Sequence, residues 1–379
     1  MKHLCENGPI VVNEVGTLRP GCFVRWRTYC VTLGCAFLVF GALSLQATTW
    51  TCIAQMQSAG KTRLEQLQMY GNQTLSFATL QDGLRYFDSD RGYIAYEKNL
   101  GVTMTLGDPV APPEERLALL KEFLKQFPTA VFAHINADTA RDLESLGFRI
   151  SELGEDARLD LETYTFVGPK KAKLRQASRS VESKGFRILE MNESEVDMAS
   201  VQQITEQWRQ SQTISSREVR FLNRPIVYGD EIDVRKFYVV SEDGTPVSFV
   251  FFDPIYQGGE VIGYSPSIKR RGFDSPTGAE EATVKYAIEQ FQQEGRTVLR
   301  LGLSPLANLE NNVFRTNWTI NFAFDLIRKY GDGRIYSFKG HDDFKHRYRG
   351  DPEKVYYASK PWWNARQLIA LMRACRIFR

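Results

Sequence analysis

Two halves of this chain show the same succession of strand and helix patterns. Each half contains a hairpin of two strands, then a loop with proline and glycine, and then a long amphipathic helix. The two loops read LGDPVAPPEE at 106–115 and SPSIKRRGFDSPTGAEE at 265–281. Because hairpins alternate with helical crossovers, the pattern predicts a duplicated α/β (α+β) fold whose sheets are mixed rather than purely parallel.

The repeat places one lobe at 61–167 and a second lobe at 168–360. In the first lobe we expect helical residues at 61–84, a hairpin over 92–98 and 101–107, a helix opened by Pro112 and Pro113, a strand at 129–135, a helix at 138–146, and strands at 147–151 and 161–167. In the second lobe we expect helices at 170–183, 196–210, 279–293 and 310–329, and strands at 186–191, 237–242, 246–252, 260–265, 297–303 and 354–359.

The N-terminal segment, residues 1–60, contains an uncharged apolar run, YCVTLGCAFLVFGALSL at 29–45. Trp26 and Trp50 lie on either side of it, as aromatic residues do at the two edges of a bilayer. The run predicts one membrane helix. Because its seventeen residues are at the short end for a span, a signal-peptide core and a buried helix remain alternatives.

From that helix we expect a membrane-associated protein that passes once through the inner membrane. Arg19, Arg25 and Arg27 precede the run and favour a cytoplasmic N-terminus with an external globular part. The scarcity of cysteine after residue 52, where only Cys375 follows, favours a globular part in the cytoplasm. Both orientations remain open.

Charge and metal-ligand counts exclude several classes of protein. The 379 residues include 48 Lys and Arg against 45 Asp and Glu, so a basic protein of the histone or ribosomal kind is excluded and any nucleic-acid contact must be local. The four histidines and six cysteines form no CxxC, HExxH or paired spacing. We therefore expect no structural metal and no disulfide framework in the globular part.

Three local groups of cations are candidate binding surfaces, and the first lies on the expected helix at 170–183. Lys171, Arg175 and Arg179 fall at i, i+4 and i+8 of this helix. A row of this kind suits successive phosphates of a nucleic-acid strand or lipid headgroups. A solvated helix face without a partner is the alternative.

The second group precedes the helix at 279–293 and comprises Lys269, Arg270 and Arg271. Thr277 is the expected N-cap of that helix, whose free N–H groups would attract phosphate or carboxylate oxygens. Glu280 and Glu281 lie in the first turn. Their alternative explanation is purely structural, because acidic side chains there complement the helix dipole.

The third group is the stretch 334–379, with eleven Lys and Arg against four Asp and Glu, a net charge of +7. Within it, FKGHDDFKHRYRGD at 338–351 mixes cations with aromatic residues, as surfaces that bind phosphates and stack on rings or acyl chains do. Residues 361–379 predict a basic amphipathic helix with Leu368, Leu371 and Cys375 on one face. We favour contact with a membrane interface for this face over docking on the protein's own core.

Several segments occur in the order seen in a known family. They are LGDPVAPPE (106–114), KLRQASRSVESKGF (173–186), the stretch from FVFFDP to PTG (249–278), LRLGLSPL (299–306) and IYSFKGHDDFKHRY (335–348). On these motifs, residues 61–360 resemble the catalytic domain of bacterial phosphatidylglycerol lysyltransferases. The resemblance implies a tandem acetyltransferase-like (GNAT-like) fold that moves an aminoacyl group from aminoacyl-tRNA to a hydroxyl of a membrane phospholipid, with no metal or redox cofactor.

The resemblance also implies site residues. The family's LG-x-(A/S)-P-L segment is matched by Gly302, Ser304 and Pro305, its FKG-x-x-x-FK segment by Lys339, Phe344 and Lys345, and its P-x-G turn by Pro276 and Gly278. The acid that follows this turn falls at Glu281, or at Glu280 in a shifted register, and would act as the general base toward the lipid hydroxyl.

Phosphate contacts complete this set. Lys171, Arg175 and Arg179 would follow the tRNA or lipid phosphates, and Lys339, Lys345 and Arg347 would line the opposite side. His341-Asp342-Asp343 replaces the family's usual apolar and basic residues, which leaves the amino acid and the acceptor lipid open. Two other interpretations stand beside this one: an acyl-CoA-dependent N-acetyltransferase, and a non-catalytic lipid-binding module with the same fold.

Overall fold

The computed structural model describes residues 63–212, 220–310, 313–331, 338–361 and 365–376. The chain divides between Lys61 and Thr62, and the described part belongs to the second of these two units. The predicted membrane helix at 29–45 lies outside the described residues. Within the described residues, no helix combines the length and the apolar character needed to cross a bilayer.

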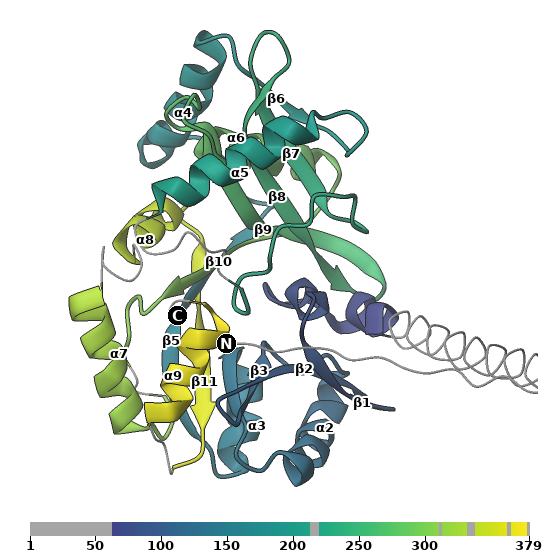
Figure 1. Cartoon of the computed structure of the whole chain (residues 1–379), viewed down its shortest axis with the longest axis vertical. Coiled ribbons are helices and arrows are strands. Elements are labelled where there is room, and N and C mark those ends of the chain that lie inside the picture. The colour runs from purple at the N-terminus through teal and green to yellow at the C-terminus, as the bar shows by residue number, and fades with distance from the viewer. Residues whose placement is uncertain (1–62, 213–219, 311–312, 332–337, 362–364, 377–379) are drawn as a thin grey trace, which may run out of the picture. The chain divides into compact units, whose positions relative to one another are not determined.

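One mixed sheet of eleven strands runs through both halves, in the order β1-β2-β3-β4-β11-β5-β10-β9-β8-β7-β6. The strands are β1 (Arg85–Ser89), β2 (Gly92–Asn99), β3 (Val102–Leu106), β4 (Val131–Ile135), β5 (Arg149–Asp160), β6 (Arg187–Glu190), β7 (Arg235–Val240), β8 (Pro246–Gln257), β9 (Glu260–Arg271), β10 (Val298–Pro305) and β11 (Asp351–Ser359). Figure 1 shows the strands of this sheet running from the first half into the second. The predicted duplicated arrangement of mixed strands is confirmed.

The two halves exchange their last strands at the centre of this sheet. β5 ends the first half but pairs antiparallel with β10 of the second, and β11 ends the second half but pairs antiparallel with β4 of the first. β5 and β11 also pair with each other over nine residue positions. Each half therefore contains a strand supplied by the other, and hydrogen bonds connect the two halves without interruption.

A short parallel contact occurs once in each half, after the hairpin. In the first half β3 and β4 pair over Met104–Leu106 and Val131–Ala133. In the second half β9 and β10 pair only at Gly263 with Val298 and at Tyr264 with Leu299. After these two pairs β9 continues beside β8 alone, and β10 continues beside β5.

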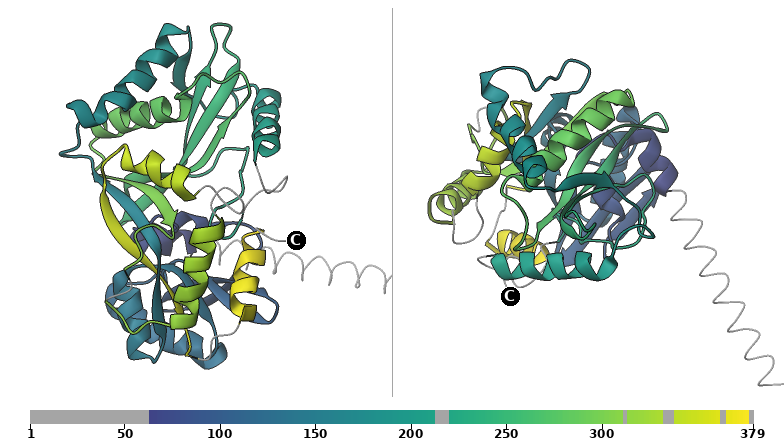
Figure 2. Two further views of the ribbon diagram at one scale, coloured as in Figure 1. Left: turned by 90° about the vertical axis from the view of Figure 1, so that its left-hand side faces the viewer. Right: turned by 90° about the horizontal axis from the view of Figure 1, so that it is seen from above.

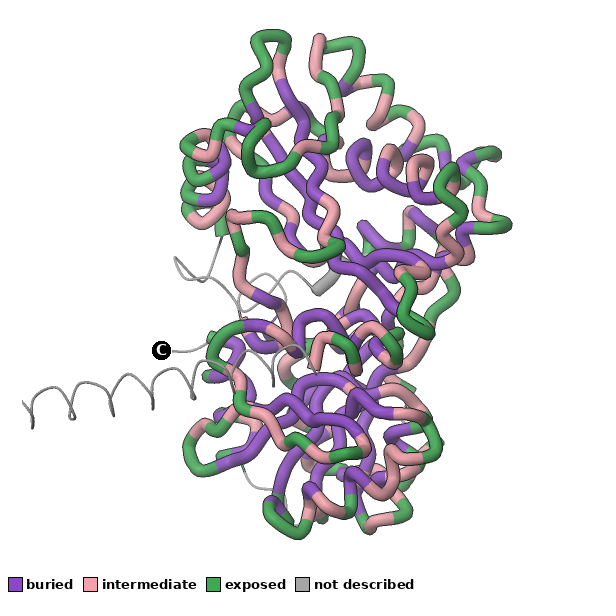
Figure 3. The backbone as a smooth tube through the Cα atoms, turned by 90° about the vertical axis from the view of Figure 1, so that its right-hand side faces the viewer, coloured by how far each residue is buried: buried purple, intermediate pink, exposed green. Residues whose placement is uncertain are grey.

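Helices cover both faces of the sheet (Figure 1). Residues 63–70 are helical. The helices that follow them are η1 (Phe77–Leu80), α2 (Pro113–Gln126), α3 (Ala137–Ser145), η2 (Pro169–Lys171), α4 (Ala172–Ser183), α5 (Met198–Ser211), α6 (Ala279–Gln293), α7 (Trp318–Gly331), α8 (Phe338–His346) and α9 (Ala365–Ala374). In the first half, α2 and α3 pack on one face and α7 and α9 on the other. In the second, α4 and α6 lie on one face and α5 on the other. The strands between these layers are buried along most of their length (Figure 3).

Helix α2 shows how the sequence builds this packing. Pro113 occupies its first turn, where a missing N–H is tolerated, and Glu114 and Glu115 follow it in the positive end of the helix dipole. Leu120 and Phe123 are fully buried at helical spacing against the sheet. The prediction of a helix opened by the two prolines is therefore confirmed.

Residues 147–167 were predicted incorrectly. The expected strands at 147–151 and 161–167 are replaced by one strand, β5, and 161–167 is a connection without a strand. β5 extends through the polar residues after 151 because strands on both of its sides hydrogen-bond it, and its acids at Glu152 and Glu155 pair with Lys354 of β11.

The expectation for the C-terminal helix was also wrong in one respect. Its apolar stripe docks on the protein's own core rather than remaining available to a membrane. Ala370, Leu371, Ala374 and Cys375 of α9 are buried in the cluster that contains β3 and β4. The cations Arg366 and Arg373 are exposed, as the amphipathic pattern predicted.

Candidate active site

Two motifs that are distant in the sequence meet at the start of α6. Arg347, which follows α8, donates a hydrogen bond to the carboxylate of Glu281 in the first turn of α6. The hydroxyl of Tyr348 donates to the backbone carbonyl of Glu281 at 3.3 Å. The side chain of Glu281 is 18% exposed, so it is not sealed inside the protein. The predicted base and one predicted cation are therefore in direct contact.

Gly278, not Thr277, is the N-cap of α6. Gly278 adopts a left-handed backbone conformation with φ of 88°, and no side chain caps the helix. A Cβ atom at this position would lie 2.9 Å from the Cβ of Ala177 on α4, closer than side chains approach. The expected cap at Thr277 is wrong, because the tight approach of α4 requires glycine; Thr277 itself is exposed.

The three consecutive cations before this turn point in different directions because they belong to strand β9. Lys269 has its Nζ 4.0 Å from the ring centroid of Phe344 on α8, and the carboxylates of Glu280 and Glu281 are close enough to favour its charge. Burial outweighs those carboxylates and lowers the pKa of Lys269. Arg270 lies on the other face of the sheet, 3% exposed and stacked on Trp208 of α5 at 3.4 Å. Arg271 is exposed at the end of the strand.

Lys345 of α8 reaches the irregular middle of β10. Its Nζ donates to the carbonyl of Gly302 at 2.7 Å, and its side chain is buried. The register between β10 and β5 shifts at this point. Ser304, two residues after Gly302, is buried and lies opposite Glu155 of β5. Lys345 and Gly302 are therefore in direct contact and Ser304 follows on the same strand, whereas the side chain of Lys339 lies outside the described residues.

The expected row of cations on helix 170–183 is interrupted. Lys171 precedes α4 in the short helix η2, and its buried Nζ donates to the hydroxyl of Tyr164 at 2.6 Å and to the carbonyl of Tyr348. Burial lowers the pKa of Lys171 to about 8. Arg175 is half-buried and donates to the carbonyls of Phe166 and Gly168. Arg179 alone of the three is exposed.

A buried polar cluster beside Lys345 was missed by the sequence analysis. Thr74 donates to Asp156 of β5, and Arg300 of β10 lies 3.9 Å from the same carboxylate. His134 of β4 interacts electrostatically with Asp156 and Lys345, and burial lowers the pKa of its imidazole. No described group bonds the other carboxylate oxygen of Asp156 or Nε2 of His134. Buried polar atoms without partners favour a site that receives water or substrate atoms.

His134 also has a strained backbone. It is the unpaired residue where the β4–β11 register shifts, and its φ is 61°. Non-glycine residues in this conformation are uncommon and are concentrated at functional sites. No short motif marks His134, Asp156 or Thr74, because they come from three separate segments. Only an isolated histidine inside an apolar strand was visible in the sequence.

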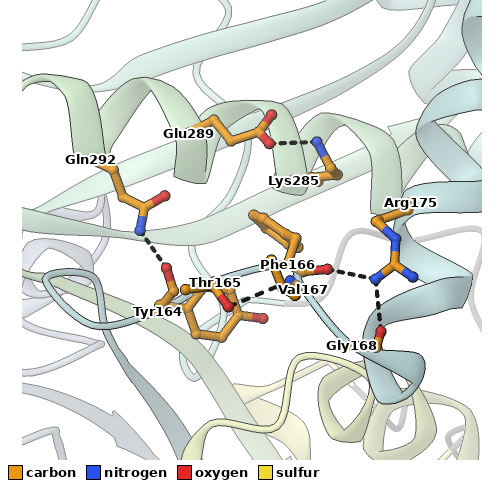
Figure 4. A pocket seen from close by; sticks show the side chains of 9 residues that line it. All are labelled: Tyr164, Thr165, Phe166, Val167, Gly168, Arg175, Lys285, Glu289 and Gln292. Carbon is orange, nitrogen blue, oxygen red and sulfur yellow. Dashed lines mark hydrogen bonds and ion pairs between the residues drawn. The ribbon is translucent and has the colours of Figure 1, made fainter.

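A pocket of about 640 Å³ lies on the outer side of α6, between that helix and the 164–168 connection (Figure 4). Arg175 forms one end of it, held by the carbonyls of Phe166 and Gly168. Lys285 and Glu289 pair across its upper wall at 2.6 Å. The pocket thus contains Arg175 of the predicted set but none of the residues at the start of α6.

In the described part of the chain, no group of three His, Cys, Asp or Glu side chains could hold a metal ion.

The sequence of both lobes matches a known family. A family model described as "Phosphatidylglycerol lysyltransferase, C-terminal" matches residues 64–359, which include both lobes and the meeting point of α6 and α8. The chain belongs to this family. A curated phosphatidylglycerol lysyltransferase from Bacillus subtilis is 28% identical over 298 residues, covering 76% of this chain and 33% of that protein. A lysylphosphatidylglycerol biosynthesis bifunctional protein from Mycobacterium marinum is 24% identical over 291 residues, covering 72% and 26%.

A solved structure shares the fold of this chain. The L-PGS structure from Bacillus licheniformis superposes with a TM-score of 0.68 at 21% identity, covering 83% of this chain and 96% of the solved one. The expected fold of two α/β lobes with mixed strands is therefore confirmed, and the solved structure shares it. The chain spans about a third or less of the length of the curated lysyltransferase relatives.

Proposed function

We propose that this chain is an aminoacyltransferase that esterifies the aminoacyl group of an aminoacyl-tRNA to a hydroxyl of a membrane phospholipid of the phosphatidylglycerol kind. The observation that supports this most directly is the family match over 64–359 together with the contact between Glu281 and Arg347 inside it. A membrane-associated location follows from the lipid substrate.

The chemistry assigned to Glu281 is general base catalysis. The lipid hydroxyl oxygen attacks the ester carbon of aminoacyl-tRNA while its proton passes to the Glu281 carboxylate. The tetrahedral intermediate then expels the ribose oxygen of the tRNA, which takes the proton back from Glu281. One ester bond forms and one breaks, so the reaction consumes no oxidant, reductant or water. Arg347 orients the carboxylate through its hydrogen bond.

Anion binding is assigned to the cations that remain exposed near this point. Arg179 on α4 and Arg271 at the end of β9 are exposed and suit tRNA or lipid phosphates. Lys171 and Arg270 are buried among the protein's own groups, so we assign them to the support of the site rather than to phosphate contact.

The test is transfer itself. The full chain is incubated with phosphatidylglycerol vesicles and a set of separately labelled aminoacyl-tRNAs, lysyl-tRNA included, and lipid extracts are assayed for label. We expect labelled lipid that is lost after RNase pretreatment and on Glu281→Gln. Glu289→Gln, two turns along the same helix, is the matched control that retains transfer. Label from acetyl-CoA without tRNA would instead identify an N-acetyltransferase, and no transfer from any donor would leave a binding module.

A further inference from the structure

Helix α7 carries a row of large apolar side chains that faces solvent. Trp318, Phe322, Leu326 and Tyr330 follow each other at intervals of four residues and are 76%, 60%, 41% and 58% exposed. The opposite side of the same helix is already used, because Ile320 and Phe324 are buried in the core. Exposed large side chains elsewhere in the described part, such as Leu100, Val167 and Phe273, lie apart on different elements.

Cations surround this row on two neighbouring helices. α7 and α9 lie side by side on the face turned to the viewer in the left view of Figure 2, and both pack on the same core cluster. Over the two helices the sequence has four cations, Arg328, Lys329, Arg366 and Arg373, all exposed, against the single acid Asp325. We call the exposed sides of α7 and α9 the α7–α9 face.

We propose that the α7–α9 face is the surface by which the folded domain lies on an anionic bilayer, with the α7 row inserted at the level of the headgroups. Tryptophan and tyrosine prefer that depth, because their rings are apolar with one polar edge. A soluble surface rarely leaves such a row in water. The cationic border matches anionic lipid, to which each Lys or Arg near the surface adds attraction. A bilayer fits this combination better than a second copy, which would oppose two positively charged faces.

The role of this membrane contact in catalysis rests on the proposed function, whereas the contact itself can be measured independently of the reaction. Only six residues separate the end of α7 at Gly331 from the start of α8 at Phe338. α8 lies beside α7 in both Figure 1 and the left view of Figure 2. A bilayer held against α7 would therefore present its headgroups on the side of the molecule where Lys345 of α8 and the adjacent Arg347 contribute to the site.

The experiment measures the depth of one side chain in the full chain. The protein is reconstituted in vesicles of phosphatidylglycerol and phosphatidylcholine whose acyl chains carry bromine, which quenches nearby tryptophan fluorescence. The difference between the wild-type chain and Trp318→Phe isolates the emission of Trp318. We expect this component to be quenched at least about twofold in the anionic vesicles, and the quenching to be lost in Phe322→Ser/Leu326→Ser and weakened in Lys329→Glu. Phe273→Ser changes an aromatic residue of the second half whose exposure, 65%, is similar to the 60% of Phe322, and it is the matched control that keeps the quenching.

Several results would overturn the proposal. Absence of quenching of Trp318, or equal loss in Phe273→Ser and in the α7 variants, would show that this face does not contact lipid. Sedimentation as a dimer that Phe322→Ser abolishes would assign the row to a second copy. If Trp318 is quenched although no aminoacyl-tRNA gives labelled lipid, the result supports membrane contact of the α7–α9 face and contradicts the proposed reaction.

Discussion

Arg347 and Glu281 form an ion pair although 66 residues separate them in the sequence. The pair fixes the end of α8 to the first turn of α6, and Tyr348 adds a second bond to the same residue. The position of the proposed base therefore depends on a segment that belongs to a different motif. This relationship leads to the first prediction.

Arg347→Ala should impair catalysis more than stability. The arginine side chain is 39% exposed, and ion pairs of this exposure contribute about 0–1 kcal/mol to stability. Loss of the hydrogen bond should nevertheless lower the transfer rate about tenfold to a hundredfold, because the Glu281 carboxylate loses its orientation. Initial rates and thermal unfolding would be compared with Arg347→Lys, which keeps the charge. A fall in melting temperature that accounts for the lost rate would contradict this prediction.

Gly263→Ala should separate β9 from β10. Gly263 provides one of the two parallel pairs between these strands, and an added Cβ would overlap the carbonyl oxygen of Val298. We expect a loss of about 1–3 kcal/mol in the free energy of unfolding in urea, as for other overpacked positions. Gly229→Ala, where the nearest atom would be 3.4 Å away, is the control. The prediction fails if both variants unfold at the same urea concentration.

Substitution of Arg270 and of Arg271 by alanine should change the free energy of unfolding by different amounts. Arg270 is buried against Trp208, so Arg270→Ala removes a packed cation–π contact and should cost about 1–3 kcal/mol of stability. Arg271 is exposed, and Arg271→Ala should change stability by less than about 0.5 kcal/mol. Chemical unfolding of the two variants checks this. Equal effects would show that the neighbours do not lie on opposite faces of β9 in solution.

Asp108 should make stability depend on pH. Burial raises its pKa from 3.8 to about 6, against the opposing hydrogen bonds from Thr139 and from the backbone N–H of Asn136. The folded protein then holds this proton more tightly than the unfolded chain does. The stabilising contribution is complete below about pH 4 and is lost as pH rises through about 6.

Asp108→Asn removes that titration and keeps an oxygen to accept from Asn136. We expect it to raise the melting temperature at pH 7.5 relative to the wild-type chain and to give little gain at pH 4. Asp274→Asn, at an exposed position, is the comparison. An equal gain at both pH values would mean that the ionisation of Asp108 is not the cause.

The local elements could be predicted because their signals are local. Two prolines and a repeat of apolar residues identify α2, and the hairpin of β2 and β3 follows from alternation and its short turn. The strand β5 was predicted to end at residue 151, because its polar second half forms a strand only when β10 and β11 lie on both sides. Such partners come from residues far along the chain, which no window of sequence contains.

The candidate site divides in the same way. Motifs placed Glu281, Arg347 and Lys345 in one region, and the structure brings them together around α8. Spacing alone put Lys171 in a solvent-facing row, whereas the end of η2 turns its side chain inward to Tyr164. The cluster of His134, Asp156 and Thr74 could not be found, because only the assembled sheet makes them neighbours.

The exchanged strands have a consequence for how the protein is made. On the ribosome the first half emerges before residues 351–359 exist, so the place between β4 and β5 stays empty until almost the whole chain has been synthesised. Until then the edges of β4 and β5 in the first half are unpaired, and unpaired strand edges are sites of misassembly during synthesis. A gene cut between the two halves should therefore yield two insoluble products, and co-expression of both pieces should be needed to recover either.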